Sequence, residues 1–197
     1  YILPIYRERF PQIDLTLVES SSSELEQFLM DGTIDICIIP LPFKFNPFPH
    51  HMFLQSRMVL LAAKNNDIQN HCYRKSSKER FPYVDIAKLD NAPFIIGHQG
   101  QRIRTINETI FKKAQITPRI VMTSRNQETI KRLVSNDIGY TFIPEHYLDI
   151  FGSFDYLDCY YLEPDVDYTW TVVVAYYNDS HCSTAMKHFL DVTDDYF

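Results

Sequence analysis

Two blocks of alternating helix-like and strand-like segments follow one another, and this order constrains the fold more than any single motif. The first block has a helical pattern at 1–10, an alternating run at 13–19, a helical pattern at 24–30 and an apolar run at 34–40. Alternation of apolar and polar residues predicts a half-buried strand, and an unbroken apolar run is typical of a strand covered on both faces. We therefore expect an α/β fold with parallel strands joined by helical crossovers.

The pattern restarts after a polar stretch at 64–78, which we expect to be a loop. The segments of the second block, in chain order, are strand 93–96, helix 102–114, strand 119–122, helix 127–135 and strand 138–144. Strands at 158–162 and 168–177 and a helix at 183–192 follow.

The tandem blocks predict two lobes, because one late strand and one helix are left over to return to the first block. We expect the chain to cross between the lobes in strand 58–63 and to return in strand 169–174. Residues 1–62 with 169–197 then form lobe I, and residues 63–168 form lobe II.

Charge and composition argue against two classes of function, nucleic-acid binding and membrane insertion. The formal net charge is −6, whereas domains that bind nucleic acid usually carry a basic stripe. No apolar run approaches the ~20 residues of a membrane span, and no secretory signal is visible. We expect no membrane partner and no direct grip on DNA by this stretch of chain.

The four cysteines, Cys37, Cys72, Cys159 and Cys182, lie far apart and form no CxxC pair. A disulfide framework is not expected in a chain of this length, and Cys37 in its apolar run predicts a buried, reduced thiol. Reducing, cytoplasmic conditions fit this pattern best.

Several segments together resemble a known family. Residues 3–19 contain Leu3-Pro4, then a helix, Phe10-Pro11, a strand and Glu19; the apolar strand ending at Ile39 follows Leu29, Gly32 and Asp35. Residues 138–144 add a Gly-containing apolar strand that ends in proline. In this order, over nearly the whole chain, the segments resemble the effector-sensing domain of LysR-type transcriptional regulators.

The resemblance implies a type-2 periplasmic-binding-protein-like fold, in which a ligand cleft lies between two α/β lobes. It implies a cytoplasmic bacterial regulator that forms homodimers or tetramers and contacts DNA only through an N-terminal winged helix-turn-helix, which this chain does not contain. It also implies a further strand and a ligand-contacting loop before Leu3.

Ligands of open parallel sheets bind beyond the carboxyl ends of the strands, where helix N-termini present N–H groups. The candidate ligand-binding residues at these strand-to-helix junctions are Ser20, Ser21, Ser22, Pro40, Gly97, His98, Gln99, Gly100, Arg102, Ser124, Asn126 and Thr141. Each has a simpler alternative. The serines and Asn126 also suit helix caps, Arg102 suits a solvated loop, Pro40 suits a packed loop and Thr141 suits the core.

No enzyme signature such as GxSxG, a P-loop or HExxH is present, so we expect neither an enzyme nor a cofactor. The pairs His50-His51 and His71-Cys72 suit exposed loops better than a metal site. The expected function is binding of a small, anionic effector that modulates DNA binding and transcription. The alternative is the solute-binding protein of a transporter.

Self-association needs an apolar surface. The pairs Tyr6 with Phe10 and Ile130 with Leu133 lie on helical faces that suit a partner copy. Packing inside the lobe competes with this interpretation.

Overall fold

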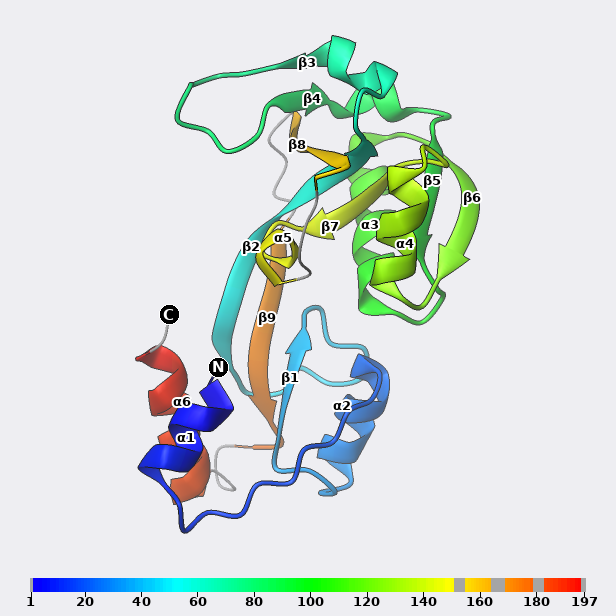
Figure 1. Ribbon diagram of the computed structural model, residues 1–197. Helices are drawn as coiled ribbons and strands as arrows, with labels where there is room; N and C mark the ends of the chain where they lie inside the picture. The colour runs from blue at the N-terminus through cyan, green and yellow to red at the C-terminus, as the bar shows by residue number, and fades with distance from the viewer. Residues whose placement is uncertain (1, 151–154, 164–168, 179–182, 196–197) are drawn as a thin grey trace. The chain divides into compact units, whose positions relative to one another are not determined.

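The computed structural model describes residues 2–150, 155–163, 169–178 and 183–195 (Figure 1). The chain divides into two compact units. Unit 1 comprises Tyr1–Gln55 with Thr171–Phe197, and unit 2 comprises Ser56–Trp170. Among the described residues, no helix is both long enough and apolar enough to cross a membrane.

Unit 1 contains helices α1 (Ile2–Arg9), α2 (Ser22–Met30) and α6 (Thr184–Asp194), strand β1 (Ile36–Pro40), the first part of β2 (His50–Ala63) and most of β9 (Thr169–Tyr176). Strand β9 lies between β1 and β2 (Figure 1). Strands β1 and β9 are antiparallel, with Ile36 opposite Tyr176 and Pro40 opposite Val172.

Among the described residues, two hydrophobic clusters lie in the interior of unit 1. Helix α2 packs Leu29 onto β1, where Cys37 and Ile39 are buried. Helix α1 packs on α6: the Tyr6 hydroxyl donates to the Ala185 carbonyl oxygen at 2.7 Å, and its ring meets Phe189 edge-on at 5.4 Å. Both contacts join the first helix of the chain to the last.

Two expectations for unit 1 are wrong. Residues 13–19 form no strand, and Leu17 in this segment is 73% exposed, because an alternating pattern makes a strand only where a neighbour takes up its hydrogen bonds. Strand β1 is antiparallel to β9, and Ile38 is 42% exposed, so β1 is not covered on both faces.

For two of the residues considered for self-association, the alternative of packing inside the lobe is confirmed. Tyr6 and Ile130 are each only 1% exposed, because Tyr6 packs between α1 and α6 and Ile130 packs inside unit 2. Phe10 stacks on the His188 ring at 4.2 Å, and Leu133 packs against the same unit 2 cluster as Ile130. These four side chains are occupied by contacts within their own units.

Unit 2 holds the end of β2 and the elements that follow it. These are η1 (Asp67–His71), β3 (Cys72–Tyr73), β4 (Tyr83–Asp85), η2 (Ile86–Leu89), β5 (Pro93–Gly97), α3 (Arg102–Ala114), β6 (Arg119–Ser124), α4 (Gln127–Ser135), β7 (Thr141–Pro144), α5 (Tyr147–Ile150) and β8 (Leu157–Glu163). Strand β2 pairs with β7 and β8 antiparallel, and β4 pairs with β8 parallel.

The β5–α3–β6–α4 block agrees with its sequence pattern. Strands β5 and β6 are parallel, and the bounds of both helices are those expected from the sequence. Successive residues of β5 face opposite sides: Phe94 meets Phe111 of α3 at 5.0 Å, whereas Ile95 clusters with Ile130 of α4. Helices α3 and α4 therefore cover opposite faces of β5.

Other parts of unit 2 differ from expectation. The stretch 64–78, expected to be a loop, contains η1 and β3, because the Asn66 side chain accepts from the Ile68 N–H at 3.1 Å and starts a 3-10 turn. Strand β7 begins at Thr141 rather than at 138. A Cβ at Gly139 would lie 2.7 Å from the Pro93 carbonyl oxygen, so the chain there passes too close to β5 for a side chain.

The expected burial of Cys37 is confirmed, since its side chain is 4% exposed, and Cys37, Cys72 and Cys159 are free cysteines. Burial, with the nearby charge of Glu26, raises the pKa of the Cys37 thiol to about 12. Cys182 lies outside the described residues.

Candidate functional site

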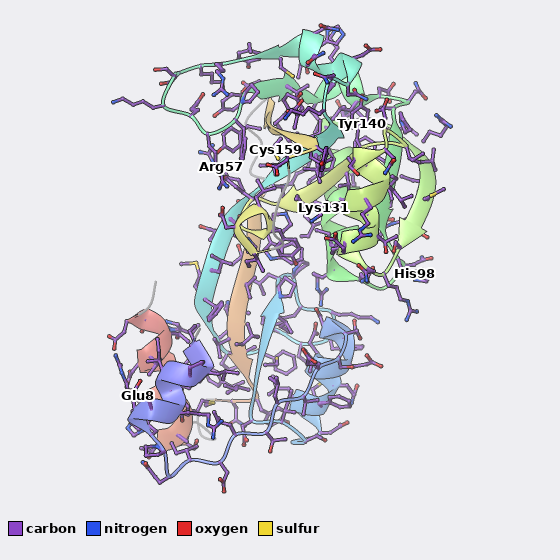
Figure 2. All side chains as sticks on the ribbon, viewed as in Figure 1. Glu8, Arg57, His98, Lys131, Tyr140 and Cys159 are labelled. Atoms are coloured by element: carbon purple, nitrogen blue, oxygen red, sulfur yellow. The ribbon has the colours of Figure 1, made fainter. Side chains whose placement is uncertain are left out.

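Two of the expected strand-to-helix junctions lie side by side at one end of unit 2. Because β5 and β6 are parallel and Gly97 is opposite Ser124, both strands deliver their carboxyl ends to the same edge. The His98 N–H donates to the Ser124 carbonyl oxygen at 3.1 Å. Figure 2 shows His98 at this end of unit 2, away from Tyr140 and Cys159.

A single side chain, which was not predicted from the sequence, ties the two junctions together. Gln101 Oε1 accepts from the His98 N–H at 2.7 Å, and its Nε2 donates to the Arg125 carbonyl oxygen at 3.0 Å. One amide thus fixes the turn after β5 and the turn after β6 against each other. We call this arrangement the Gln101 clamp.

The first junction has glycines where the backbone requires them. Gly100 has a φ of +91°, in the left-handed region that favours glycine. A Cβ at Gly97 would lie 2.6 Å from the Ile103 Cγ2 atom, so the close approach of α3 to β5 depends on a missing side chain. His98 and Gln99 are exposed, whereas Arg102 is half-buried at the start of α3.

The start of α3 differs from those of α2, α4 and α6. Gln101 occupies its N-cap position without a side-chain cap hydrogen bond, because its amide is engaged in the clamp. Ser21, Asn126 and Ser183 cap α2, α4 and α6 with their side chains. Helix α3 therefore presents first-turn N–H groups that no capping side chain takes up, as anion-binding helix starts do.

At the second junction, the capping alternative is confirmed. Asn126 Oδ1 accepts from the N–H groups of Glu128 at 2.8 Å and Thr129 at 3.2 Å. The Ser124 hydroxyl oxygen accepts from the Asn126 N–H at 3.1 Å. These side chains build the turn, and their contact with a ligand stays a prediction.

In unit 1, the serine run starts α2. Ser21 and Glu24 form a capping box, in which each side chain accepts from the other residue's N–H. The Ser20 hydroxyl also donates to Glu24 Oε2 at 2.6 Å. Ser22 is the first residue of the helix and is half-buried. No strand precedes this helix start among the described residues, in contrast to the junctions of unit 2.

Pro40 ends β1, and a buried carboxylate accepts hydrogen bonds from the loop that follows. Glu26 is fully buried, and its Oε2 accepts from the N–H groups of Lys44 at 2.8 Å and Phe45 at 3.0 Å. The Leu41 N–H donates to the Thr171 carbonyl oxygen at 2.8 Å. Glu26 was not predicted from the sequence, because an acid inside an amphipathic helix gives no signal of its burial.

Thr141 is 1% exposed and pairs with Leu61 in the sheet, so its position is a core position. It lines a hollow of about 10 Å³ together with Gln127, Lys131 and Tyr147. A space of this size holds about one water molecule. Figure 2 shows Lys131 on α4.

Metal binding finds no support among the described side chains, which form no cluster of three or more metal-binding groups. His50 Nδ1 lies 2.8 Å from the Phe48 carbonyl oxygen, and His51 Nε2 lies 2.5 Å from an Asp194 carboxylate oxygen. Cys72 Sγ donates to the Ile68 carbonyl oxygen at 3.1 Å.

Comparison with known proteins places the whole chain in one sequence family. Residues 1–197 match the family model described as the LysR substrate binding domain. The regulator AlsR of Bacillus subtilis (strain 168), an HTH-type transcriptional regulator, is 28% identical over 194 residues, which are 96% of this chain and 59% of the relative. CzcR of Bacillus cereus, also an HTH-type transcriptional regulator, is 22% identical over 198 residues, with coverage of 99% and 62%. The chain thus spans about three-fifths of the length of these relatives.

Solved structures show the same fold. The regulatory domain of CcmR from Synechocystis PCC6803, in complex with 2-PG, matches with a TM-score of 0.82 at 17% identity, covering 99% of this chain and 88% of that one. The effector-binding domain of BenM with its effector benzoate matches with a TM-score of 0.79 at 16% identity, covering 99% and 83%. The expected two-lobed, periplasmic-binding-protein-like fold class is confirmed.

Proposed function

Because the chain belongs to the family of LysR substrate binding domains, we propose that it is the effector-sensing part of a transcriptional regulator. A small metabolite binds to it, and the complete regulator then changes its engagement with DNA and its control of transcription. Only a ligand that binds two states of the protein with different affinities shifts their populations. A winged helix-turn-helix outside this chain makes the DNA contact.

The Gln101 clamp is the observation that carries the effector site. It holds the turns after β5 and β6 at one edge of unit 2 through hydrogen bonds to His98 and Arg125. Binding residues held by fixed neighbours lose little conformational entropy when a ligand arrives. We therefore propose that the effector contacts both turns, through Gly97–Arg102 and Ser124–Asn126.

The proposed ligand is a small carboxylate or another anion. The start of α3 lacks a side-chain cap, and the partial positive charge of a helix N-terminus favours an anion by about 0.3–1 kcal/mol. Arg102, half-buried beside it, adds a guanidinium that can bind a carboxylate through two hydrogen bonds. A solved structure of the same fold supports this class, since the effector-binding domain of BenM holds the carboxylate benzoate.

In unit 1 we propose ligand contacts from the serine run and from Pro40. Ser20 and Ser21 are engaged with Glu24, so Ser22 is the best placed of the three to donate its hydroxyl to a ligand. The cleft between two lobes, implied by the resemblance, stays a prediction, as do the boundaries of the lobes at 62 and 169.

The remaining proposals concern the whole protein: a homodimer or tetramer that works in the cytoplasm and is not an enzyme. The relatives are transcriptional regulators, which does not favour the alternative of a transporter's solute-binding protein. The coding sequence upstream of Tyr1 separates the two. A helix-turn-helix segment there supports the regulator, and a signal peptide contradicts it.

The direct test is a thermal-shift screen of small carboxylates, amino acids and sugar phosphates. A ligand in hundredfold excess over its Kd stabilises the folded state by about 2.7 kcal/mol. We expect at least one anion to raise the unfolding temperature of the wild type, and Gln101→Leu to weaken its binding about tenfold or more. If no anion stabilises the domain, the proposed ligand class is wrong.

A further inference from the structure

A second concave region lies in unit 2, away from the junctions. It has a volume of about 670 Å³, within the range of ~300–1,000 Å³ typical of small-molecule sites. Its lining comes from β3, the chain that leads into β4, and the chain from Asp155 into β8, with Gln69 of η1 and Leu148 of α5 beside them. Cys159 of its floor lies at the other end of unit 2 from His98 (Figure 2). We call this region the β8 hollow.

One end of the β8 hollow carries an unneutralised carboxylate. Asp158 lies on β8 between the buried residues Leu157 and Cys159, and is itself half-buried. Within the described part of the chain, the Asp158 side chain forms no ion pair; its one hydrogen bond, from the Tyr160 hydroxyl, is long at 3.5 Å. A partly desolvated carboxylate with so weak a partner is costly, and a cation supplied by a ligand would lower that cost.

The arginines of the lining do not supply this cation. Arg80 is held by Asp149, with Nη2 to Oδ1 at 2.7 Å, and lies 3.6 Å from Glu145. Arg74 is exposed, and its Nη1 donates to the Glu79 carbonyl oxygen at 2.8 Å. Both arginines of the lining are therefore engaged by groups other than Asp158.

Aromatic rings around the β8 hollow suit a cation with an apolar body. Tyr73, Phe81 and Tyr160 all line it. Cations already lie over rings in this region: Arg80 is 5.0 Å from the centroid of Phe81, and Lys75 is 4.1 Å from that of Tyr83. Ring faces attract ammonium groups at such distances.

The pKa values of two neighbouring thiols reflect the same negative charge. Burial, and then the charge of Asp158, raise the pKa of Cys72 to about 11 and that of Cys159 to about 12. Both thiols therefore stay protonated at neutral pH. They are not reactive groups, and the carboxylate whose charge acts on both of them is Asp158.

We propose that the β8 hollow is a second ligand site, which takes an organic ammonium ion on an apolar or aromatic body, with Asp158 as its counter-ion. This site is separate from the effector site at the junctions and does not rest on it. It differs in ligand charge, because the junctions present N–H groups and the hollow presents a carboxylate.

The test uses two probes that share a body and differ in charge, phenethylammonium and phenylacetate, titrated by calorimetry into the wild-type chain. We expect phenethylammonium to bind with a Kd below about 10 mM, and Asp158→Asn to weaken it about tenfold or more. The exposed Asp14→Asn, which makes the same change of charge in unit 1, should leave it unchanged.

Two further measurements keep the proposal falsifiable. The unfolding temperature of Asp158→Asn without ligand establishes that this variant folds. If it does not fold, the Arg74→Gln variant replaces it as the test. Removing this exposed cation removes its repulsion of the ammonium group, so phenethylammonium binding should strengthen about twofold or more while the fold stays intact. The proposal is overturned if phenethylammonium does not saturate, if a folded Asp158→Asn variant binds it as well as the wild type does, or if Arg74→Gln has no effect.

Discussion

The two halves of the predicted α/β pattern behave differently. In unit 2, the segment from Pro93 to Ser135 forms β5, α3, β6 and α4 almost as its pattern predicts, with β5 and β6 parallel. In unit 1, the similar pattern from Tyr1 to Pro40 yields two helices but one strand, and that strand is antiparallel to its neighbour. Helices form in both units, and the difference lies in the strands.

The comparison shows that a helical pattern predicts its element locally, whereas a strand pattern does not. A helix satisfies its backbone hydrogen bonds within its own segment, whereas a strand needs a neighbour that only the tertiary fold provides. Strand β5 has β6 beside it, and β1 has β9 from the far end of the chain. The residues 13–19 have the alternation of a strand without such a neighbour among the described residues.

The largest expected effect tests whether the stability of unit 2 depends on the buried side chains of β5 more than on the exposed residues 13–19 of unit 1. Phe94→Ala should destabilise the domain by about 3–5 kcal/mol, because Phe94 is fully buried among Phe111, Phe142 and Tyr140. Urea unfolding followed by circular dichroism measures the change. The control is Leu17→Ala, which should change stability by less than about 0.5 kcal/mol. Equal losses in both variants would contradict the contrast between the segments.

The next effect concerns unit 1, where a buried carboxylate stabilises the loop that follows β1. Glu26→Ala should cost about 2–3 kcal/mol, since it leaves the N–H groups of Lys44 and Phe45 without their acceptor. The same unfolding measurement applies, with the exposed Glu8→Ala as control. A loss as small as that of the control would mean that the loop holds its conformation without Glu26.

The helix caps offer a matched pair of smaller effects. Asn126→Ala in unit 2 and Ser21→Ala in unit 1 should each cost about 1 kcal/mol, because each side chain accepts from an N–H in the first turn of its helix. Similar losses would support the conclusion that helix formation is local in both units. A loss in only one of them would show that tertiary contacts, rather than the cap, hold the other helix.

The smallest effect is a pH dependence in unit 2. Burial lowers the pKa of His146 below its usual 6.5, and the charge of Asp149 partly opposes this. The unfolded chain then binds more protons than the folded one just below pH 6.5, so this contribution to stability is complete above that pH and is lost as pH falls toward the folded pKa. His146→Gln should flatten this part of the stability curve, measured by urea unfolding between about pH 5 and 8. A steeper fall in the variant than in the wild type would contradict the sign.

Local signals predicted much of the fold. The bounds of α3 and α4, the serine start of α2 and the stop at Gly32 follow from periodicity and capping chemistry. The direction of β1 in unit 1 could not be predicted from local signals, because its partner is β9, more than a hundred residues away. The short β3 and β4 carry too few residues for a pattern.

For the candidate site, the sequence predicted the two turns but not the side chain that joins them. Glycines and polar residues after apolar strands identified the turns at Gly97–Arg102 and Ser124–Asn126, which the structure brings together. Gln101 was missed, because a glutamine that bridges two turns has the same sequence signature as a solvated one. The burial of Glu26, and the absence of a paired cation at Asp158 among the described residues, likewise depend on neighbours distant in sequence.

The central claim is that an effector binds where the Gln101 clamp joins the two turns of unit 2, and amide hydrogen exchange tests it most directly. Exchange is measured on the wild-type chain with and without the anion that stabilises it most in the thermal-shift screen. We predict slower exchange at residues 98–104 and 125–129 when the ligand is bound, and loss of this protection in Gln101→Leu. Unchanged exchange in both segments of the wild type under saturating ligand would contradict the claim.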